Sequence, residues 1–158
     1  MLAVPHILVG GAIGKQIERP YVALPVAFAS HYVLDAIPHV DTISAFGFGL
    51  LKTSALTLAD LFVGFAVLAL LISRQKRAIW MFLGALAAMA VDGCVVLSLS
   101  LPFPHGIPGV SAICYLHRIA GRSLPNSQWV IGLGTQVLVV AAAILILRKR
   151  TASDSRVE

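Results

Sequence analysis

Four long apolar stretches constrain the fold of this chain more than any other feature of its sequence. They cover residues 20–37, 54–73, 78–101 and 129–147. A helix needs ~20 mostly apolar residues to cross a hydrocarbon core ~30 Å thick, and these stretches reach or approach that length. A fifth apolar stretch, residues 2–14, is shorter, and we expect a short or re-entrant helix there. The sequence therefore predicts an all-α, polytopic transmembrane helical bundle of about five membrane helices.

Composition excludes most soluble classes of protein. Hydrophobic residues make up 58% of the 158 residues and charged residues only 12%, whereas an average soluble domain has roughly 25% charged residues. With a mean hydropathy of +0.90, a globule of this size could not cover its own core. A cytosolic enzyme, a coiled coil and a free nucleic-acid binder are therefore excluded, and membrane lipids are the expected partners. We expect one domain over residues 1–150 and a disordered cytoplasmic tail over residues 151–158.

The basic residues predict the direction in which the chain crosses the membrane. Nine of the twelve Lys and Arg residues fall within residues 15–19, 74–77 and 148–156. Membrane proteins keep an excess of Lys and Arg in their cytoplasmic loops. If these three clusters are cytoplasmic, the chain starts outside, crosses the inner membrane five times and ends inside. The loops 38–53 and 102–128 would then face the periplasm or exterior.

Ionisable residues within or beside the apolar stretches are the main indication of function. An Asp at the centre of a membrane helix costs ~2.5–3.5 kcal/mol on insertion scales, so such residues usually face a partner or a cavity. The topology rests on Lys and Arg alone, yet it brings many His and Asp residues to the same outer side. These residues are His6, His31, Asp35, His39, Asp41, Asp60, Asp92 and His117. The sequence therefore predicts a polar site that opens to the periplasm or exterior.

The strongest local motif is SHYVLDAIPHVD, at residues 30–41. His31 and Asp35 are four residues apart, so they lie on one face of a helix. Pro38 disfavours helical geometry at the preceding residue and removes an amide donor, so we expect the helix to end there. Imidazole nitrogen together with carboxylate oxygen suits Zn, Mn, Fe or Ni. We interpret the motif as a metal site; the alternative is a His–Asp pair that braces a helix end.

Two acidic residues in later stretches have both structural and functional interpretations. Asp60 is a candidate site residue, and the alternative is an acid that packs against Ser or Thr across the bundle. Asp92 precedes Gly93, where a loosened helix would give the carboxylate room to reach a site. A purely structural role for Asp92 is the alternative.

The outer loop carries candidate substrate-binding residues. We expect a short helix over residues 110–120, with His117 and Arg118 at its end and Arg122 just beyond it. Two Arg residues on the outer face run against the positive-inside trend. They indicate recognition of an anion or phosphate beside a metal, or, alternatively, Arg side chains that reach to lipid headgroups.

An N-terminal His, the pattern S-H-x-x-x-D-x-x-P-H-x-D and isolated Asp residues in later stretches together resemble the predicted membrane-bound metal-dependent hydrolases. These are small bacterial and archaeal inner-membrane proteins. The resemblance covers most of the chain thinly and residues 30–41 strongly. It implies a metal at His31 and Asp35. The further ligands that it implies are His6, His39, Asp41 and Asp92.

We therefore expect a metal-dependent hydrolase whose divalent ion is Zn, with Mn or Fe as alternatives. The ion would lower the pKa of bound water to ~7, and Asp41 or Asp60 would act as general base. A site at the membrane surface favours a lipid or lipid-linked phosphoester as substrate. One alternative is a metal-ion or proton transporter, since intramembrane Asp and His also build relays. Another is a structural membrane protein whose polar site only fixes helix packing.

Overall fold

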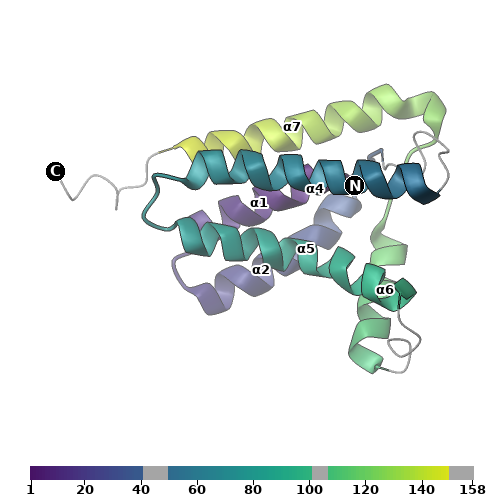
Figure 1. Cartoon of the computed structure of the whole chain (residues 1–158), viewed down its shortest axis with the longest axis horizontal. Coiled ribbons are helices and arrows are strands. Elements are labelled where there is room, and N and C mark those ends of the chain that lie inside the picture. The colour runs from purple at the N-terminus through teal and green to yellow at the C-terminus, as the bar shows by residue number, and fades with distance from the viewer. Residues whose placement is uncertain (41–49, 101–106, 150–158) are drawn as a thin grey trace.

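The computed structural model describes residues 1–40, 50–100 and 107–149, and most of these residues are helical. The helices are α1 (Ala3–Gln16), α2 (Pro20–Asp35), α4 (Leu50–Ile72), α5 (Ala78–Ser100), α6 (Pro108–Ala120) and α7 (Trp129–Arg148), with a 3-10 turn at Asn126–Gln128. Figure 1 shows the long helices α4, α5 and α7 lying lengthwise in the bundle, with α6 turned across one end. The predicted all-helical fold is therefore confirmed.

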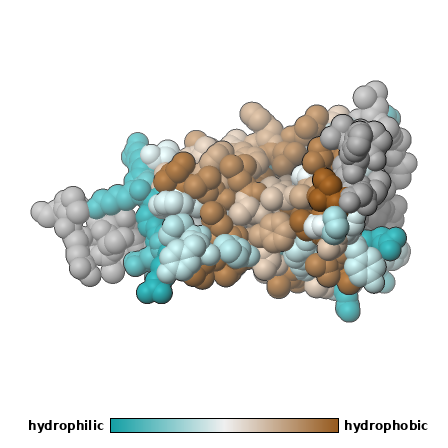
Figure 2. All heavy atoms as spheres, turned by 90° about the horizontal axis from the view of Figure 1, so that it is seen from below, coloured by the Kyte–Doolittle hydropathy of each residue, from teal (hydrophilic) through white to brown (hydrophobic). Residues whose placement is uncertain are grey.

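Among the residues that the structure describes, three helices are long and apolar enough to cross a membrane, over Lys52–Ile72, Ala78–Ser98 and Trp129–Arg148. Figure 2 shows a hydrophobic band across the middle of the molecule with polar side chains toward both ends. These features identify an integral membrane protein. Helices α1 and α2 have 14 and 16 residues, which corresponds to ~21 and ~24 Å at 1.5 Å per residue. Because both are shorter than a ~30 Å core, the structure supports three spans, and five crossings stay a prediction.

The helix boundaries follow the local sequence closely. Helix α2 ends at Asp35, shortly before Pro38, as the lost amide donor of proline predicts. Helix α6 begins at Pro108 rather than at residue 110, because proline suits the first turn of a helix, where an amide has no partner. It ends at Ala120, the predicted boundary.

The short first helix is the centre of the bundle. Ten of the fourteen residues of α1 are buried, and α1 contacts α2, α4, α5 and α7. Its Ile7 and Leu8 belong to the main hydrophobic cluster together with Leu68, Met81 and Leu147 from the surrounding helices. The segment predicted as short or re-entrant therefore forms the core on which the longer helices pack.

Glycine residues allow α1 and α5 to approach closely. A Cβ atom built on Gly10 would lie 2.5 Å from the Gly84 carbonyl oxygen and 2.9 Å from the Ala85 Cα. Small residues at helix interfaces permit such contact between backbones. The close approach of α1 to α5 therefore depends on the absence of a side chain at Gly10.

Figure 1 shows the end of the bundle opposite α6. There, cationic and amide side chains donate hydrogen bonds to helix-end carbonyls. The buried Lys15 ammonium donates to the carbonyl oxygens of Leu147 and Lys149, both at 2.7 Å. Gln75 donates to the same Leu147 oxygen at 2.8 Å. Because the last carbonyls of a helix have no partner within it, these contacts stabilise the C-terminal end of α7.

We predict that Gly10→Ala lowers the free energy of unfolding in detergent relative to Gly134→Ala by about 1–3 kcal/mol, the usual cost of overpacking. Both substitutions gain helix propensity, about 1 kcal/mol per residue. Only Gly10 meets backbone atoms, because a Cβ on Gly134 meets nothing within 4 Å. Denaturant titration of both variants measures the difference. Equal stabilities would show that α1 and α5 do not approach as closely as described.

Candidate metal centre

The centre begins with a His–Asp pair on the last turn of α2. His31 and Asp35 face the same side of the helix, and their Nε2 and Oδ2 atoms lie 3.1 Å apart. Both side chains are buried, with exposed fractions of 0% and 2%. The Nδ1–H of His31 donates to the Ala88 carbonyl oxygen on α5 at 2.8 Å. This contact leaves the lone pair of neutral His31 on Nε2, which points into the cluster, as a metal-binding imidazole requires.

Helix α1 adds a second imidazole. His6 lies parallel to His31, with ring centroids 4.0 Å apart and an interplanar angle of 15°. The His6 Nε2 lies 3.2 Å from the Asp35 Oδ1. The two oxygens of Asp35 therefore face imidazoles from two different helices, α1 and α2.

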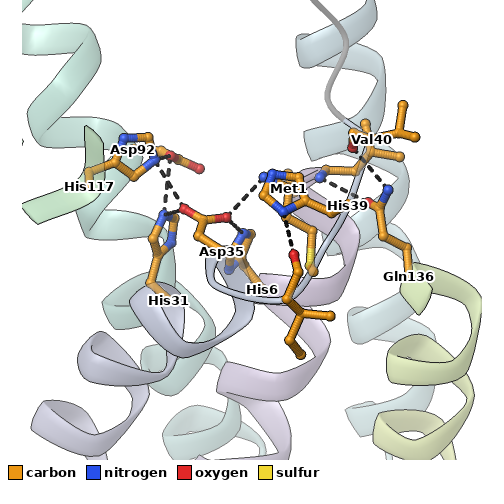
Figure 3. Close-up of polar contacts among 12 residues, drawn as sticks. Met1, His6, His31, Asp35, His39, Val40, Asp92, His117 and Gln136 are labelled. Atoms are coloured by element: carbon orange, nitrogen blue, oxygen red, sulfur yellow. Dashed lines mark hydrogen bonds and ion pairs between the residues drawn. The ribbon is translucent and has the colours of Figure 1, made fainter. Parts of the chain in front are cut away.

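Helices α5 and α6 complete the cluster from the other side (Figure 3). The His117 Nε2 lies 3.2 Å from the Asp35 Oδ2 and 3.3 Å from the Asp92 Oδ1. The His31 Nε2 is 3.4 Å from the same Asp92 oxygen. The side chains of Asp92 and His117 are 34% and 28% exposed. The cluster thus has one fully buried side and one side that is open to its surroundings.

The donor atoms form two overlapping groups that could each hold a metal ion. One group is His6, His31 and Asp35, the other is His31, Asp92 and His117, and within each group the ligand atoms lie within 4.8 Å of one another. Two ligands bound at ~2.0–2.1 Å with tetrahedral angles lie about 3.4 Å apart. The contacts of 3.1–3.4 Å between nitrogen and oxygen atoms match that spacing closely. The spacing of these donor atoms therefore suits a divalent ion, and the His6 ring, which lies parallel to His31, has to turn before both lone pairs reach one ion.

Two buried nitrogens support the same interpretation. Within the described residues, the Nε2 atoms of His6 and His31 have no partner in hydrogen-bond geometry, although Asp35 is near both. Buried polar atoms in folded proteins are almost always paired, so each exception needs an explanation. A metal ion bound at either nitrogen provides one.

His117 is the member of the cluster that lies on the loop helix. Hydrogen bonds from its imidazole to Asp35 and Asp92 raise the pKa of His117 to about 9. Without a metal, the protonated ring balances part of the carboxylate charge. A bound cation would balance the same charge in its place.

His39 lies near the cluster but outside both donor groups. Its Nδ1–H donates to the Ile37 carbonyl oxygen at 2.8 Å. Its backbone amide donates to the Arg122 carbonyl oxygen at 3.2 Å, and its carbonyl oxygen accepts from the Leu124 amide at 2.8 Å. His39, predicted as a metal ligand, is thus placed where it ties the segment after α2 to the segment after α6. Asp41, the other predicted residue beyond Pro38, lies outside the described residues.

Asp60 lies apart from both donor groups. Its Oδ2 accepts a hydrogen bond from the Ala3 amide at the start of α1. The first amides of a helix have no partner within it, so this carboxylate caps α1 from a neighbouring helix. The alternative interpretation of Asp60 as a packing acid is thus partly right, but its partner is a backbone amide rather than Ser or Thr.

The two Arg residues of the outer loop lie beside the cluster rather than in it. Arg118 is exposed, and its guanidinium carbon lies 5.9 Å from the centre of the Tyr115 ring. The Arg122 amide donates to the Asp35 carbonyl oxygen at 2.9 Å, so its backbone helps to hold the end of α2. Both residues were predicted to bind substrate together with His117, but only His117 reaches the donor groups.

One polar residue with a structural role carries no recognisable motif in the sequence. Gln136, buried in the apolar α7, accepts from the Leu2 amide at 3.0 Å and donates to the Val40 carbonyl oxygen at 2.9 Å. It therefore joins α7 to the start of α1 and to the segment after α2. A single Gln in an apolar stretch is the only signal that could have indicated this role.

No family model matches the chain, and neither the curated proteins nor the solved structures contain a match to it.

We predict that Asp92→Asn and His31→Ala lower metal affinity by at least about 10- to 100-fold, the loss found even for residues that only orient a metal ligand. Asp60→Asn is the matched control, because Asp60 faces the same cavity as Asp92 but caps a helix. The Asn side-chain oxygen still accepts from Ala3, so this variant should keep its metal. Elemental analysis of detergent-purified protein after metal loading gives the comparison. Equal metal content in all variants would contradict the assignment of the cluster.

Proposed function

We propose that this chain is a membrane-embedded, metal-dependent hydrolase with its His/Asp site at the outer face of the inner membrane. The observation that carries the proposal is that the metal-binding groups form a buried half and a partly exposed half. His6, His31 and Asp35 are buried, whereas Asp92 and His117 are partly exposed. Catalytic metal sites keep an open position for water or substrate, and structural sites are closed. The motif shared with the predicted membrane-bound metal-dependent hydrolases supports the same function.

The chemistry of the donors favours Zn, with Mn and Fe as alternatives, because nitrogen and oxygen ligands suit these ions and the cluster has no thiolate. When bound, such an ion polarises the bond to be cleaved and lowers the pKa of a water molecule to ~7. The chain's own residues would hold this geometry. The Ala88 carbonyl fixes the His31 ring, and the parallel His6 ring limits its rotation.

Asp60 is the proposed general base among the described residues. It lines the same cavity as Asp92, so its carboxylate faces the space next to the donors. An ionised carboxylate offers about four acceptor sites, more than the contact with Ala3 uses. Asp60 would therefore take the proton of the attacking water while still capping α1. Asp41 is the alternative base.

Arg118 and Arg122 are the proposed binding residues for an anionic group. Both are exposed and follow His117 along the chain. A planar guanidinium binds phosphate through paired hydrogen bonds, so an Arg near the metal suits a phosphoester. A lipid or lipid-linked phosphoester is the proposed substrate.

The distribution of polar groups favours hydrolysis over transport. A transporter needs polar groups at several depths of the membrane. The metal-capable groups gather where α6 covers the bundle, while at the opposite end Lys15 and Gln75 bind helix-end carbonyls. A site confined to one end suits a reaction at the membrane surface.

The proposed orientation follows the Lys and Arg bias and includes five crossings. We predict that a reporter fused after Arg150 is cytoplasmic, because the basic clusters stay on the cytoplasmic side. A reporter inserted near Ser44 should be external. Alkaline phosphatase and green fluorescent protein fusions, which are active on opposite sides, measure both positions. The reverse result would place the site at the cytoplasmic face.

We predict that Asp60→Asn lowers turnover by about 10²–10⁴-fold, the contribution of a general base, with metal content unchanged. Asp92→Asn should lower both turnover and metal content. The measurement is phosphate or headgroup release from a panel of phospholipids and lipid phosphates in detergent. If the metal-loaded wild type cleaves no member of the panel, the hydrolase proposal is wrong. If Asp60→Asn remains fully active, the proposed role of Asp60 as general base is wrong.

A further inference from the structure

A cavity lies beside the exposed half of the metal centre. It has a volume of about 550 Å³ and is formed by α4, α5 and residues 1–3. This volume falls within the ~300–1,000 Å³ typical of small-molecule sites. Asp92 lines the cavity and also contacts His31 and His117, so the cavity and the metal centre share one residue.

The lining of the cavity is amphipathic. Its polar residues are Thr57, Asp60 and Asp92, and the rest of the lining is apolar side chains and glycine. Leu61 on α4 and Met89 on α5 belong to the apolar part. A ligand that fits this lining has one polar end, which lies at Asp92, and an apolar body.

The cavity lies between two helices that can cross the membrane, α4 and α5. Figure 1 shows α5 diverging from α4 toward the end of the bundle that carries α6. Two residues that line the cavity, Val96 and Leu97, are 61% and 48% exposed, so the cavity opens at the surface of the bundle. A Cβ atom built on Gly93 would meet nothing within 4 Å, so the helix surface next to Asp92 borders open space. These faces meet lipid in a membrane, and an amphipathic molecule can therefore enter sideways from the bilayer.

We propose that this cavity binds one hydrocarbon chain of a bilayer lipid whose phosphoester headgroup lies at the metal centre beside Asp92. The assignment of the headgroup rests on the proposed function. The carboxylates of Asp60 and Asp92 repel a bare anion, so a bound cation is needed before a phosphate can lie there. A chain that moves from bilayer to cavity stays in apolar surroundings, and the hydrophobic effect therefore adds little. The headgroup supplies the affinity, and the cavity selects the chain by shape.

The test uses substitutions that place a large side chain in the cavity. Gly93→Phe places a large ring where a Cβ now meets nothing, and Gly93→Ala is the small control. Gly134→Phe is the matched control, because Gly134 lies on the apolar α7 and its Cβ would also meet nothing within 4 Å. Leu61→Trp fills the same cavity from α4 and replaces Gly93→Phe if that variant does not fold. Metal content and melting temperature show which variants keep the native fold.

The probe is phosphatidic acid with a photoactivatable diazirine on one acyl chain, incorporated into phosphatidylcholine nanodiscs that contain metal-loaded protein. In the wild type, cross-links should fall on the α4 and α5 residues that line the cavity. In Gly93→Phe they should decrease at least about fivefold, the lower end of the cost of overpacking, while Gly134→Phe and Gly93→Ala keep them. Cross-links that lie elsewhere, or that are equal in Gly93→Phe and Gly134→Phe, overturn the proposal.

Two further measurements separate this proposal from the proposed function. Removal of metal by chelation should weaken the cross-links of phosphatidic acid more than those of a diazirine diacylglycerol, which has no phosphate. Equal weakening would overturn the placement of the headgroup. If the wild type shows cavity cross-links but releases no phosphate from any lipid, the hydrolase proposal fails while the lipid site stands. If lipid is hydrolysed but Gly93→Phe cleaves long-chain and soluble short-chain phosphoesters as fast as the wild type, the lipid site fails alone.

Discussion

The buried carboxylate of Asp35 is the constraint on which the arrangement of the bundle depends. Its side chain is 2% exposed, and the groups around it are three imidazoles and the Met1 amino group, which lies 2.9 Å away. Burying an unpaired charge is very costly, so the helices that supply its partners have to meet at the end of α2. The effect is clearest for α6, which has no buried residue of its own. Its polar contacts with the bundle include those of His117 with Asp35 and Asp92 and that of the Cys114 thiol with Ser98 on α5.

The distance between α1 and α5 decides both the close packing of the bundle and the polar contacts of the cluster. His6 and Gly10 are four residues apart and therefore share a face of α1. The absence of a side chain at Gly10 lets this face approach α5. On α5, Ala88 and Asp92 are also one turn apart, so the same helix supplies a carbonyl to the Nδ1 of His31 and a carboxylate near its Nε2. A shift of α1 or α5 by one residue would separate the imidazoles from their partners.

The sequence predicts those parts of the molecule that local chemistry decides. Hydropathy and proline positions were sufficient for the helices, including the end of α2 before Pro38, and spacing was sufficient for the pair His31 and Asp35. Contacts between distant segments have no local signal. The capping of α1 by Asp60 and the position of α6, which brings His117 to Asp35, both depend on tertiary packing. Three of the apolar stretches are confirmed as long enough to span, whereas α1 and α2 have only 14 and 16 residues.

The partial exposure of Asp92 and His117 helps to distinguish a polar site that only fixes helix packing from a site that reacts with a second molecule. A polar group that only fixes helix packing is most useful when it is fully buried and fully paired, because water then cannot compete for its partners. The side of the cluster formed by His6, His31 and Asp35 is fully buried, but three of its nitrogens have no partner in hydrogen-bond geometry. The side formed by Asp92 and His117 is not fully buried, because both side chains are partly exposed and Asp92 borders a cavity. A donor set that is rigid on one side and accessible on the other fits a bound ion that must also meet a second molecule.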